Sequence, residues 1–319
     1  MDGRRVNAFL LILVLMLIQA CSFWSKENPD AEPTSLTQSE QLILDDYKAE
    51  VEVGRNMAGR LLTFYGEYQD KGLKNYVNTV GSYVAKSGDY PDRRYMFGIL
   101  DSDSVNAFAC PGGYILVTRG VIEAAANEAE LAAILGHETA HVGKKHMFNA
   151  LRSMSKDQVE RAQAEASARK RPDKFSRARL RPEPDVNDSG SALAKLMTTA
   201  SGAGMGILQA AKAGMSLLLE KGLDKDLEFE ADREGVRYAI RAGYEPKALD
   251  RFLERLSANK KKKNDKTVMD VTHPSIPDRR KVIADALNRL GADQIIGAIG
   301  KERFDTARAD LVNNRKDSK

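Results

Sequence analysis

One helical stretch, residues 131–149, constrains this chain more than any other, because it contains the pattern H-E-x-x-H at His137, Glu138 and His141. Residues four apart on a helix project from the same face, about 6 Å apart along the axis. Two imidazoles placed in this way can share one metal ion at about 2.0–2.1 Å, the distance that zinc prefers. Glu138 is then close enough to take a proton from metal-bound water, which is the arrangement of a zinc hydrolase.

The histidines of the chain are few and clustered. A short pattern with three fixed positions also occurs by chance in helical proteins, so the motif alone does not separate a metal site from an ordinary buried helix. The chain has only four histidines: His137, His141 and His146 fall within one ten-residue window, and His273 lies in a second, Pro-flanked motif. Isolated core histidines would be scattered, so this clustering favours a metal site.

The N-terminus has the pattern of a bacterial lipoprotein signal. Arg4 and Arg5 precede an apolar stretch, residues 8–18, that is too short to span a bilayer comfortably. The Leu-Ile-Gln-Ala-Cys that follows resembles a lipobox, in which the cysteine, here Cys21, carries the lipid. We therefore predict a signal peptide over residues 1–20, and a periplasmic chain anchored to the outer membrane through this cysteine. The alternative is an ordinary secretory signal with an incidental cysteine.

Charge and cysteine content exclude few classes of protein. A net charge of +4 over 319 residues is mild. The basic stretch at residues 151–191 lacks interleaved aromatic residues and has no nucleic-acid fold around it, so we predict no nucleic-acid partner. The only other cysteine is Cys110. If Cys21 is acylated, no intramolecular disulfide forms, and the protein depends on its core and its metal for stability.

The hydrophobic pattern predicts an α+β fold that is mostly helical, with a small sheet directly before the H-E-x-x-H helix. Apolar residues recur at helical spacing over residues 39–65 and 71–87, and short apolar runs at 95–100, 105–110 and 114–119 predict three strands. The predicted organisation is a tether over residues 21–38, a main domain over residues 39–290 that includes a basic, flexible excursion at 151–191 and apolar helices or a membrane-surface segment at 192–219, and a polar C-terminal tail over residues 291–319.

The position of the sheet suggests how a peptide substrate binds. An exposed strand edge beside the metal can pair with an extended peptide, which is the usual way in which main chain recognises main chain. The third predicted strand is the candidate edge, and the alternative is an ordinary core strand. The candidate residues are Gly113, Tyr114, Ile115, Leu116 and Val117.

A catalytic zinc site needs a third protein ligand. One known extension of the motif uses a glycine to turn the chain towards a later histidine, but here Lys144 holds the glycine position and His146 falls one residue early. We therefore expect the helix to continue and His146 to point away from the metal, on the helix surface or behind a ligand. A carboxylate from residues 224–242 fits better, because Glu228 and Asp232 share a helix face: Glu228 can bind zinc while Asp232 accepts the ring N–H of a ligand histidine. The alternative is a solvated acidic face.

Four segments then point to a known family. They are residues 105–117 (VNAFACPGGYILV), 127–146 (NEAELAAILGHETAHVGKKH), 228–235 (EFEADREG) and 273–279 (HPSIPDR). In this order they resemble the HtpX/BepA/Ste-type gluzincin metallopeptidases of family M48, over roughly residues 40–290. The resemblance implies a gluzincin-type metalloprotease domain. The chain lacks the multiple spans of the membrane-embedded members and ends before the tetratricopeptide domain of some relatives, so it is similar to the periplasmic lipoprotein branch.

The resemblance also implies a role for each motif residue. It implies one zinc ion per chain, with His137, His141 and Glu228 as ligands, Glu138 as general base, Asp232 behind a ligand histidine, and His273 and Arg279 as catalytic loop residues near the metal and the developing oxyanion.

The leading hypothesis is a zinc endopeptidase of the bacterial envelope, tethered through Cys21, that degrades misfolded or misassembled periplasmic and outer-membrane proteins. Zinc-bound water attacks the peptide bond, Glu138 accepts its proton, and Arg279 or His273 stabilises the oxyanion. A non-proteolytic chaperone or assembly factor for envelope proteins is the alternative, although the intact motif residues argue against it. A third hypothesis is a latent protease in which His273 caps the zinc until a client displaces it.

Overall fold

The computed structural model describes residues 38–153, 222–263 and 273–316. The predicted signal peptide, the lipid anchor at Cys21, the apolar segment 192–219 and nearly all of the basic excursion 151–191 lie outside these residues. The chain divides into two compact units, residues 1–44 and 45–319, and the elements from α3 onwards belong to the second. No helix among the described residues is long and apolar enough to cross a membrane.

The secondary structure agrees with the periodicity of the sequence, and the mostly helical fold with a small sheet is confirmed. The elements are α2 (Gln38–Tyr65), α3 (Lys71–Lys86), β1 (Met96–Leu100), β2 (Ala107–Cys110), η1 (Pro111–Gly113), β3 (Tyr114–Thr118), α4 (Arg119–Ala124), α5 (Glu128–Gly143), α6 (His146–Ser153), α10 (Lys225–Arg241), α11 (Ala248–Lys263), α13 (Ile276–Arg289), η2 (Ala292–Gln294), α14 (Lys301–Ala307) and α15 (Ala309–Lys316).

The strand order corrects one prediction. The described strands form a sheet in the order β1-β3-β2, in which β3 pairs in parallel with β1 and antiparallel with β2. The segment Gly113–Val117 was expected to offer an exposed edge, and this is wrong, because β3 is paired on both sides. Pro111 and two glycines make the tight turn between β2 and β3, and Gly113 has φ +105°, a conformation that suits glycine. Among the described strands, β2 is therefore the edge on this side.

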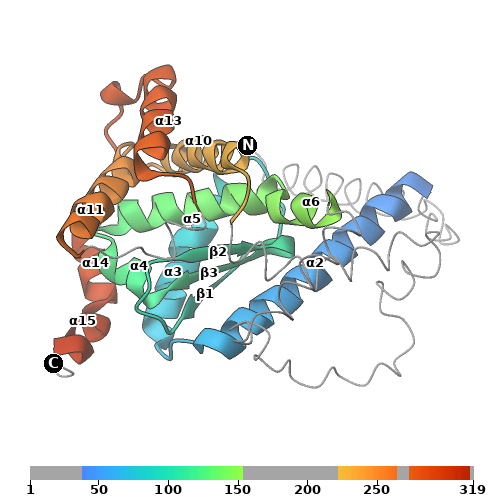
Figure 1. Ribbon diagram of the computed structural model, residues 1–319, viewed down its shortest axis with the longest axis horizontal. Coiled ribbons are helices and arrows are strands. Elements are labelled where there is room, and N and C mark those ends of the chain that lie inside the picture. Colours follow the sequence, from blue (N-terminus) through green and yellow to red (C-terminus); the bar gives the residue numbers. More distant parts are fainter. Residues whose placement is uncertain (1–37, 154–221, 264–272, 317–319) are drawn as a thin grey trace, which may run out of the picture. The chain divides into compact units, whose positions relative to one another are not determined.

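The two faces of the sheet pack against different helices, as side-chain alternation along a strand requires. Ile115 and Val117 of β3 point into the larger core, which contains apolar residues of α3, α5, α10, α11 and α13. Leu116, between them, points into a smaller core with Met57 of α2 and Phe148 of α6. Figure 1 shows the result: α5 lies between α10 and the sheet, so the H-E-x-x-H helix is enclosed on both sides.

The helix α5 begins after a capping residue, Asn127. The side chain of Asn127 accepts a hydrogen bond from the backbone N–H of Glu130 at 3.0 Å, which satisfies one of the free donors of the first turn. Every residue of α5 is buried. A helix that is hydrophobic or small on most sides is placed in the interior.

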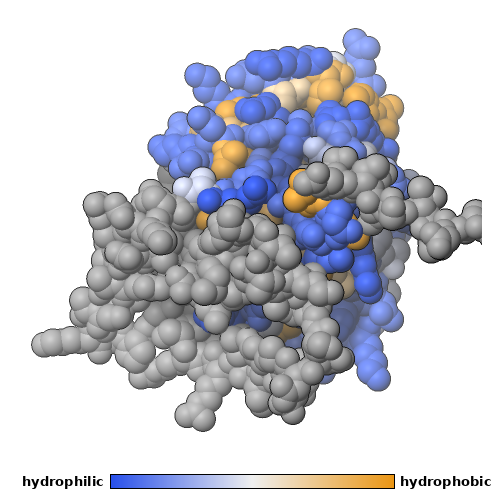
Figure 2. Space-filling model, turned by 90° about the vertical axis from the view of Figure 1, so that its right-hand side faces the viewer, coloured by the Kyte–Doolittle hydropathy of each residue, from blue (hydrophilic) through white to orange (hydrophobic). Residues whose placement is uncertain are grey.

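The C-terminal segment is part of the folded domain and not a tail beyond residue 290. Phe304 and Leu311 are almost completely buried in the larger core. Glu128, at the start of α5, is buried and accepts hydrogen bonds from Tyr76, Tyr244 and Arg303 of α14. The segment was predicted to be a tail because its sequence is largely polar, but two apolar anchors and the ion pair between the exposed Arg303 and the buried Glu128 dock it. Figure 2 shows that the described surface on one side of the molecule is mainly hydrophilic, with hydrophobic residues in small patches.

Candidate active site

The site is formed where α5 and α10 approach each other closely. Gly136, which precedes the first motif histidine, faces Gly235 of α10: a Cβ at Gly136 would lie 2.7 Å from the carbonyl oxygen of Gly235, and a Cβ at Gly235 would lie 2.5 Å from the backbone nitrogen of His137. Only hydrogen fits at either position. The absence of both side chains brings the carboxylates of α10 within reach of the histidines of α5.

Four side chains converge at this contact. The Nε2 atoms of His137 and His141 are 3.1 Å apart, near the roughly 3.3 Å expected for two nitrogens that share a tetrahedral zinc ion. Glu228 faces both rings, with Oε2 3.5 Å from Nε2 of His137 and Oε1 3.6 Å from Nε2 of His141. Nε2 of His273 lies 3.5 Å from Oε2 of Glu228. Ligand atoms of His137, Glu228 and His273 all lie within 4.8 Å of one another.

The charges at this cluster suit a cation. Oε2 of Glu228 is buried and has no hydrogen-bond partner, an unusual state for a carboxylate oxygen unless a cation is to occupy the site. Burial raises the pKa of Glu228, but the neighbouring imidazoles outweigh it and hold this pKa well below its usual range. Burial lowers the pKa of His273 to about 3, so this ring is neutral and can offer a lone pair. Three imidazoles and one carboxylate are the donor set that zinc accepts.

Asp232 lies behind His137, as predicted, with Oδ1 2.9 Å from its Nδ1. Burial by itself lowers the pKa of His137, but the hydrogen bond and the charge of Asp232 raise it to about 9. Arg279 in turn grips Asp232 with two hydrogen bonds, Nε to Oδ2 at 2.9 Å and Nη2 to Oδ1 at 2.6 Å. Three side chains therefore follow one another away from the cluster: the imidazole of His137, the carboxylate of Asp232 and the guanidinium of Arg279.

This arrangement corrects the role expected for Arg279. An oxyanion donor must face the substrate, but the Arg279 side chain is only 2% exposed, donates two hydrogen bonds to Asp232 and contacts Nδ1 of His137 at 3.5 Å. It is also not among the residues that line the adjoining cavity. The geometry makes it a residue that holds Asp232, and through it His137.

The position of His146 corrects a second expectation. The helix does not continue past residue 143: α5 ends at Gly143, Lys145 adopts the left-handed conformation with φ +57°, and α6 starts at His146. The chain therefore turns back, and Nδ1 of His146 lies 3.0 Å from Nδ1 of His141. Burial lowers the pKa of His146 to about 4. His146 therefore contacts the ring of His141 and does not point away from the motif.

A cavity opens on the other side of the cluster, and Glu138 lines it. Glu138 is 4% exposed, and burial raises the pKa of its carboxyl, which suits a group that must accept a proton near neutral pH. The remaining lining residues are of three kinds: the cluster residues His141, Glu228 and His273, the edge-strand segment Asn106, Ala107, Phe108 and Ala109, and the largely apolar wall of Met57, Met147, Gly222 and Leu223.

Asn106 is a site residue that the pattern search missed. Its Oδ1 accepts the N–H of Ala107 at 3.0 Å, but its Nδ2 is buried and has no partner. An unpaired buried amide costs about 1–3 kcal/mol, so a donor left free at a cavity wall is suited to a ligand carbonyl. Asn106 lies inside the first of the four motif segments. The available signal in the sequence was a polar residue directly before an apolar strand.

Comparisons with known proteins agree with this geometry. The model of Peptidase family M48 matches residues 72–286. The chain is 30% identical over 219 residues to the beta-barrel assembly-enhancing protease of Yersinia pestis, covering 68% of this chain and 39% of that protein. It is 27% identical to the protein of the same name from Escherichia coli (strain K12), covering 74% and 43%. It is 26% identical to the mitochondrial metalloendopeptidase OMA1 of Schizosaccharomyces pombe, covering 69% and 57%.

The matched family region contains the whole cluster. His137, Glu138, His141, Glu228, Asp232, His273 and Arg279 all lie between residues 72 and 286. The chain spans about two fifths of the length of the two bacterial relatives. The family match itself covers more than half of this chain, and the chain belongs to peptidase family M48.

Proposed function

We propose that the protein is a zinc-dependent endopeptidase of the bacterial cell envelope that cleaves unfolded or misassembled envelope proteins. The observation that carries the proposal is the convergence of the His137, His141 and Glu228 donors around an unpartnered carboxylate oxygen, with Glu138 beside them at the cavity. Family membership favours proteolysis over the alternative of a chaperone without catalysis.

One zinc ion per chain would be held by His137, His141 and Glu228. When bound, zinc supplies a Lewis acid that polarises a carbonyl and lowers the pKa of water. The protein supplies the geometry: two helices in close contact fix the three donors, and Asp232 with Arg279 orients the first histidine from behind.

Glu138 is the proton carrier of the proposed reaction. It accepts a proton from the attacking water and delivers it to the nitrogen of the leaving amine. Burial raises the pKa of the Glu138 carboxyl. The free energies of its protonated and ionised forms are therefore closer to each other near neutral pH, and the cycle uses both forms. Arg279 is turned towards Asp232, so the residue proposed to stabilise the oxyanion is His273, which lines the cavity, and a zinc ion held by the three donors would add its positive charge.

The substrate would bind as an extended strand along β2. This strand is the edge of the described sheet on the cavity side, and residues 106–109 line the cavity. Strand addition uses main-chain groups that every polypeptide has, so it suits substrates defined by being unfolded more than by sequence. Nδ2 of Asn106 offers one further donor to a substrate carbonyl.

The test compares Glu138→Gln with Glu228→Ala. Glu138→Gln should keep one zinc per chain and lose cleavage of casein by at least about 100-fold, because the base is gone while the ligands remain. Glu228→Ala should lose zinc at micromolar free metal, measured by elemental analysis. Near wild-type cleavage by the first variant would contradict the mechanism, and full zinc retention by the second would exclude Glu228 as a ligand.

A latent form is favoured by one observation, the position of His273. Its Nε2 belongs to the same convergent group as His137 and Glu228, so it can take the fourth position that chemistry requires to be open. His273→Ala should then raise the basal rate on an unfolded substrate, whereas a lower rate would indicate an oxyanion role. An unchanged rate with unchanged zinc affinity would contradict both.

The location in the envelope is proposed from the lipobox-like sequence ending at Cys21. Acylation of this cysteine would anchor the mature chain to the periplasmic face of the outer membrane. Cys21→Ser should move the protein from the membrane fraction to the soluble fraction, or leave an unprocessed precursor. A mature form that fractionates in the same way with and without Cys21 would exclude the anchor.

A further inference from the structure

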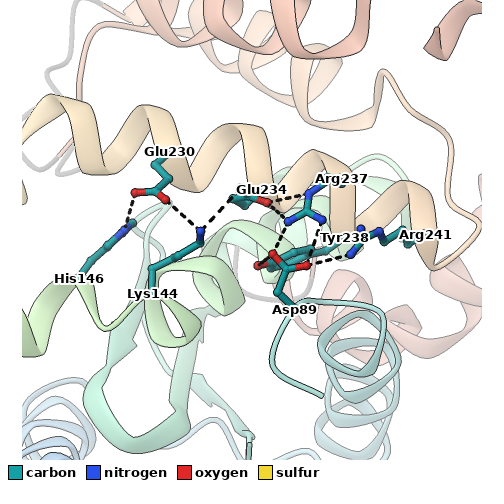
Figure 3. A network of polar contacts seen from close by, with 8 residues as sticks. All are labelled: Asp89, Lys144, His146, Glu230, Glu234, Arg237, Tyr238 and Arg241. Carbon is teal, nitrogen blue, oxygen red and sulfur yellow. Dashed lines mark hydrogen bonds and ion pairs between the residues drawn. The ribbon is translucent and has the colours of Figure 1, made fainter. Parts of the chain in front are cut away.

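The ring of His146 connects a motif histidine to a carboxylate on another helix. Its Nδ1 lies 3.0 Å from Nδ1 of His141, and its Nε2 lies 3.2 Å from Oε2 of Glu230 on α10. Glu230 also contacts Lys144, with 3.1 Å between Oε1 and Nζ. Figure 3 shows His146 and Lys144 both reaching up to Glu230 from the end of α5 and the start of α6. His146 is 3% exposed, so water does not compete for its contact with His141, whereas the Glu230 side chain is 33% exposed and reaches solvent.

With the proposed zinc ion in place, one arrangement of protons satisfies all of these contacts. Nε2 of His141, which faces His137 and Glu228, would then offer its lone pair to the metal, and Nδ1 of His141 would carry the hydrogen. His141 therefore donates to Nδ1 of His146, which must be an acceptor. The remaining nitrogen of His146 then carries its hydrogen and donates to Glu230, because a carboxylate only accepts. The chain of contacts runs in one direction, from His141 to Glu230.

We infer that His146 is a positioning residue for zinc binding, which holds the His141 ring in its Nδ1–H form and links it to the negative charge of Glu230. This inference rests on the proposed function, since it assumes that Nε2 of His141 is a zinc ligand. Outer partners of this kind fix the ligand's tautomer and raise its basicity. His137 has a carboxylate, Asp232, in direct contact. For His141 the corresponding carboxylate is that of Glu230, which acts through the imidazole of His146.

The local backbone makes the contact available. On a continuous helix, the residue five positions after His141 would lie about 140° around the axis and could not meet its ring. The break after Gly143 and the left-handed conformation of Lys145 turn the chain so that His146 returns to the motif. His146 falls one residue too early to be the third histidine ligand of the glycine-containing motif. The same position places it behind the second motif histidine, His141.

The experiment compares four forms at residue 146 in a full chain carrying Glu138→Gln, so that metal binding is read without proteolysis. In His146→Asn, the amide oxygen stands near the position of Nδ1 and can still accept from His141. In His146→Gln the amide lies one bond farther out, near Glu230, and in His146→Ala no acceptor remains. Zinc affinity is measured by competition with a chromogenic chelator, and the melting temperature of the metal-free protein is recorded beside it.

We expect the Ala and Gln variants to bind zinc about 10–100-fold more weakly and the Asn variant to remain close to the parent. A merely structural histidine predicts a different result, in which the melting temperature falls for all variants and zinc affinity does not follow the acceptor. Equal zinc affinity in the Ala variant and the parent, or equal affinity in the Asn and Gln variants, overturns the inference while leaving the proposed zinc site intact. If the parent itself binds no zinc, the proposed function fails as well.

A second measurement needs no substitution at residue 146. Four histidines make the ¹⁵N spectrum of the labelled imidazoles assignable. The zinc-loaded Glu138→Gln protein should show the hydrogen of His146 on Nε2 and that of His141 on Nδ1. The opposite tautomer of His146 overturns the inference.

Discussion

The close contact between Gly136 and Gly235 predicts a sharp response to one added methyl group. In Gly235→Ala, the new Cβ would stand 2.5 Å from the nitrogen and 2.7 Å from the Cα of His137. Ordinary contacts of a Cβ begin at 3.4 Å, so the helices must separate by about 1 Å. The obstacle is backbone and cannot rotate away. Since Glu228 and Asp232 are on the same helix as Gly235, their carboxylates move away from the histidines together.

The magnitude follows from two opposing effects. Alanine is favoured over glycine in a helix by about 1 kcal/mol, whereas overpacking costs about 1–3 kcal/mol. We take the upper end because the contact is with backbone, so Gly235→Ala should be about 2 kcal/mol less stable than wild type. Gly59 of α2 is the matched control, because a Cβ there meets nothing within 4 Å. Gly59→Ala should be about 1 kcal/mol more stable than wild type.

Both variants are unfolded in urea in their metal-free forms, and zinc affinity is measured by chelator competition. Gly235→Ala should lower stability and zinc affinity together, while Gly59→Ala should raise stability and leave zinc affinity unchanged. If Gly235→Ala is as stable as Gly59→Ala and binds zinc as wild type does, close helix contact does not set the ligand geometry, and the account of the site given above is refuted.

Three further predictions concern parts of the same fold. Arg279→Met leaves the fully buried Asp232 carboxylate without its cation and should cost about 3–5 kcal/mol of unfolding free energy; a slower enzyme of unchanged stability would instead favour an oxyanion role. A hydrogen bond from Arg237, with help from Arg241, lowers the pKa of Asp89 to about 2. Asp89→Asn should therefore be less stable than wild type, by at most about 1 kcal/mol because the ion pair is partly exposed. This difference in unfolding free energy should be full above about pH 4 and should vanish as the pH falls towards 2. A difference that does not depend on pH would contradict this. Phe304→Ala should lower the free energy of unfolding by about 3–5 kcal/mol. Ile296→Ala, at a fully exposed position, should change it by less than about 0.5 kcal/mol. Equal effects of the two substitutions would place α14 outside the core.

The helices and strands could be predicted because their signals are local. Helical spacing of apolar residues located α2 and α3. The order of the strands is not a local property. Three short apolar runs do not specify which of them pairs on both sides: β3 lies in the middle of the sheet although it is no more apolar than β1.

The site residues divide in the same way. His137, Glu138, His141, Glu228 and Asp232 carry their information in spacing along single helices, and the structure brings them together. The contacts of Asn106 and His146 depend on features of the fold that the spacing of residues along the sequence does not predict. One is an amide left without a partner at a cavity wall. The other is a helix break at a lysine in the left-handed conformation, for which sequence rules expect glycine or asparagine.

The resulting site has a front and a back, and this division decides what each substitution can report. Glu138 and Asn106 line the cavity, so their loss should change catalysis or substrate binding and leave the proposed zinc affinity unchanged. Asp232 and Arg279 stand behind His137, and His146 stands behind His141. Loss of a residue at the back leaves the cavity wall unchanged but frees a ligand ring to rotate or to change tautomer. Zinc affinity, measured apart from turnover, therefore separates the two groups, and Arg279 is the residue for which the sequence and the structure predict opposite answers.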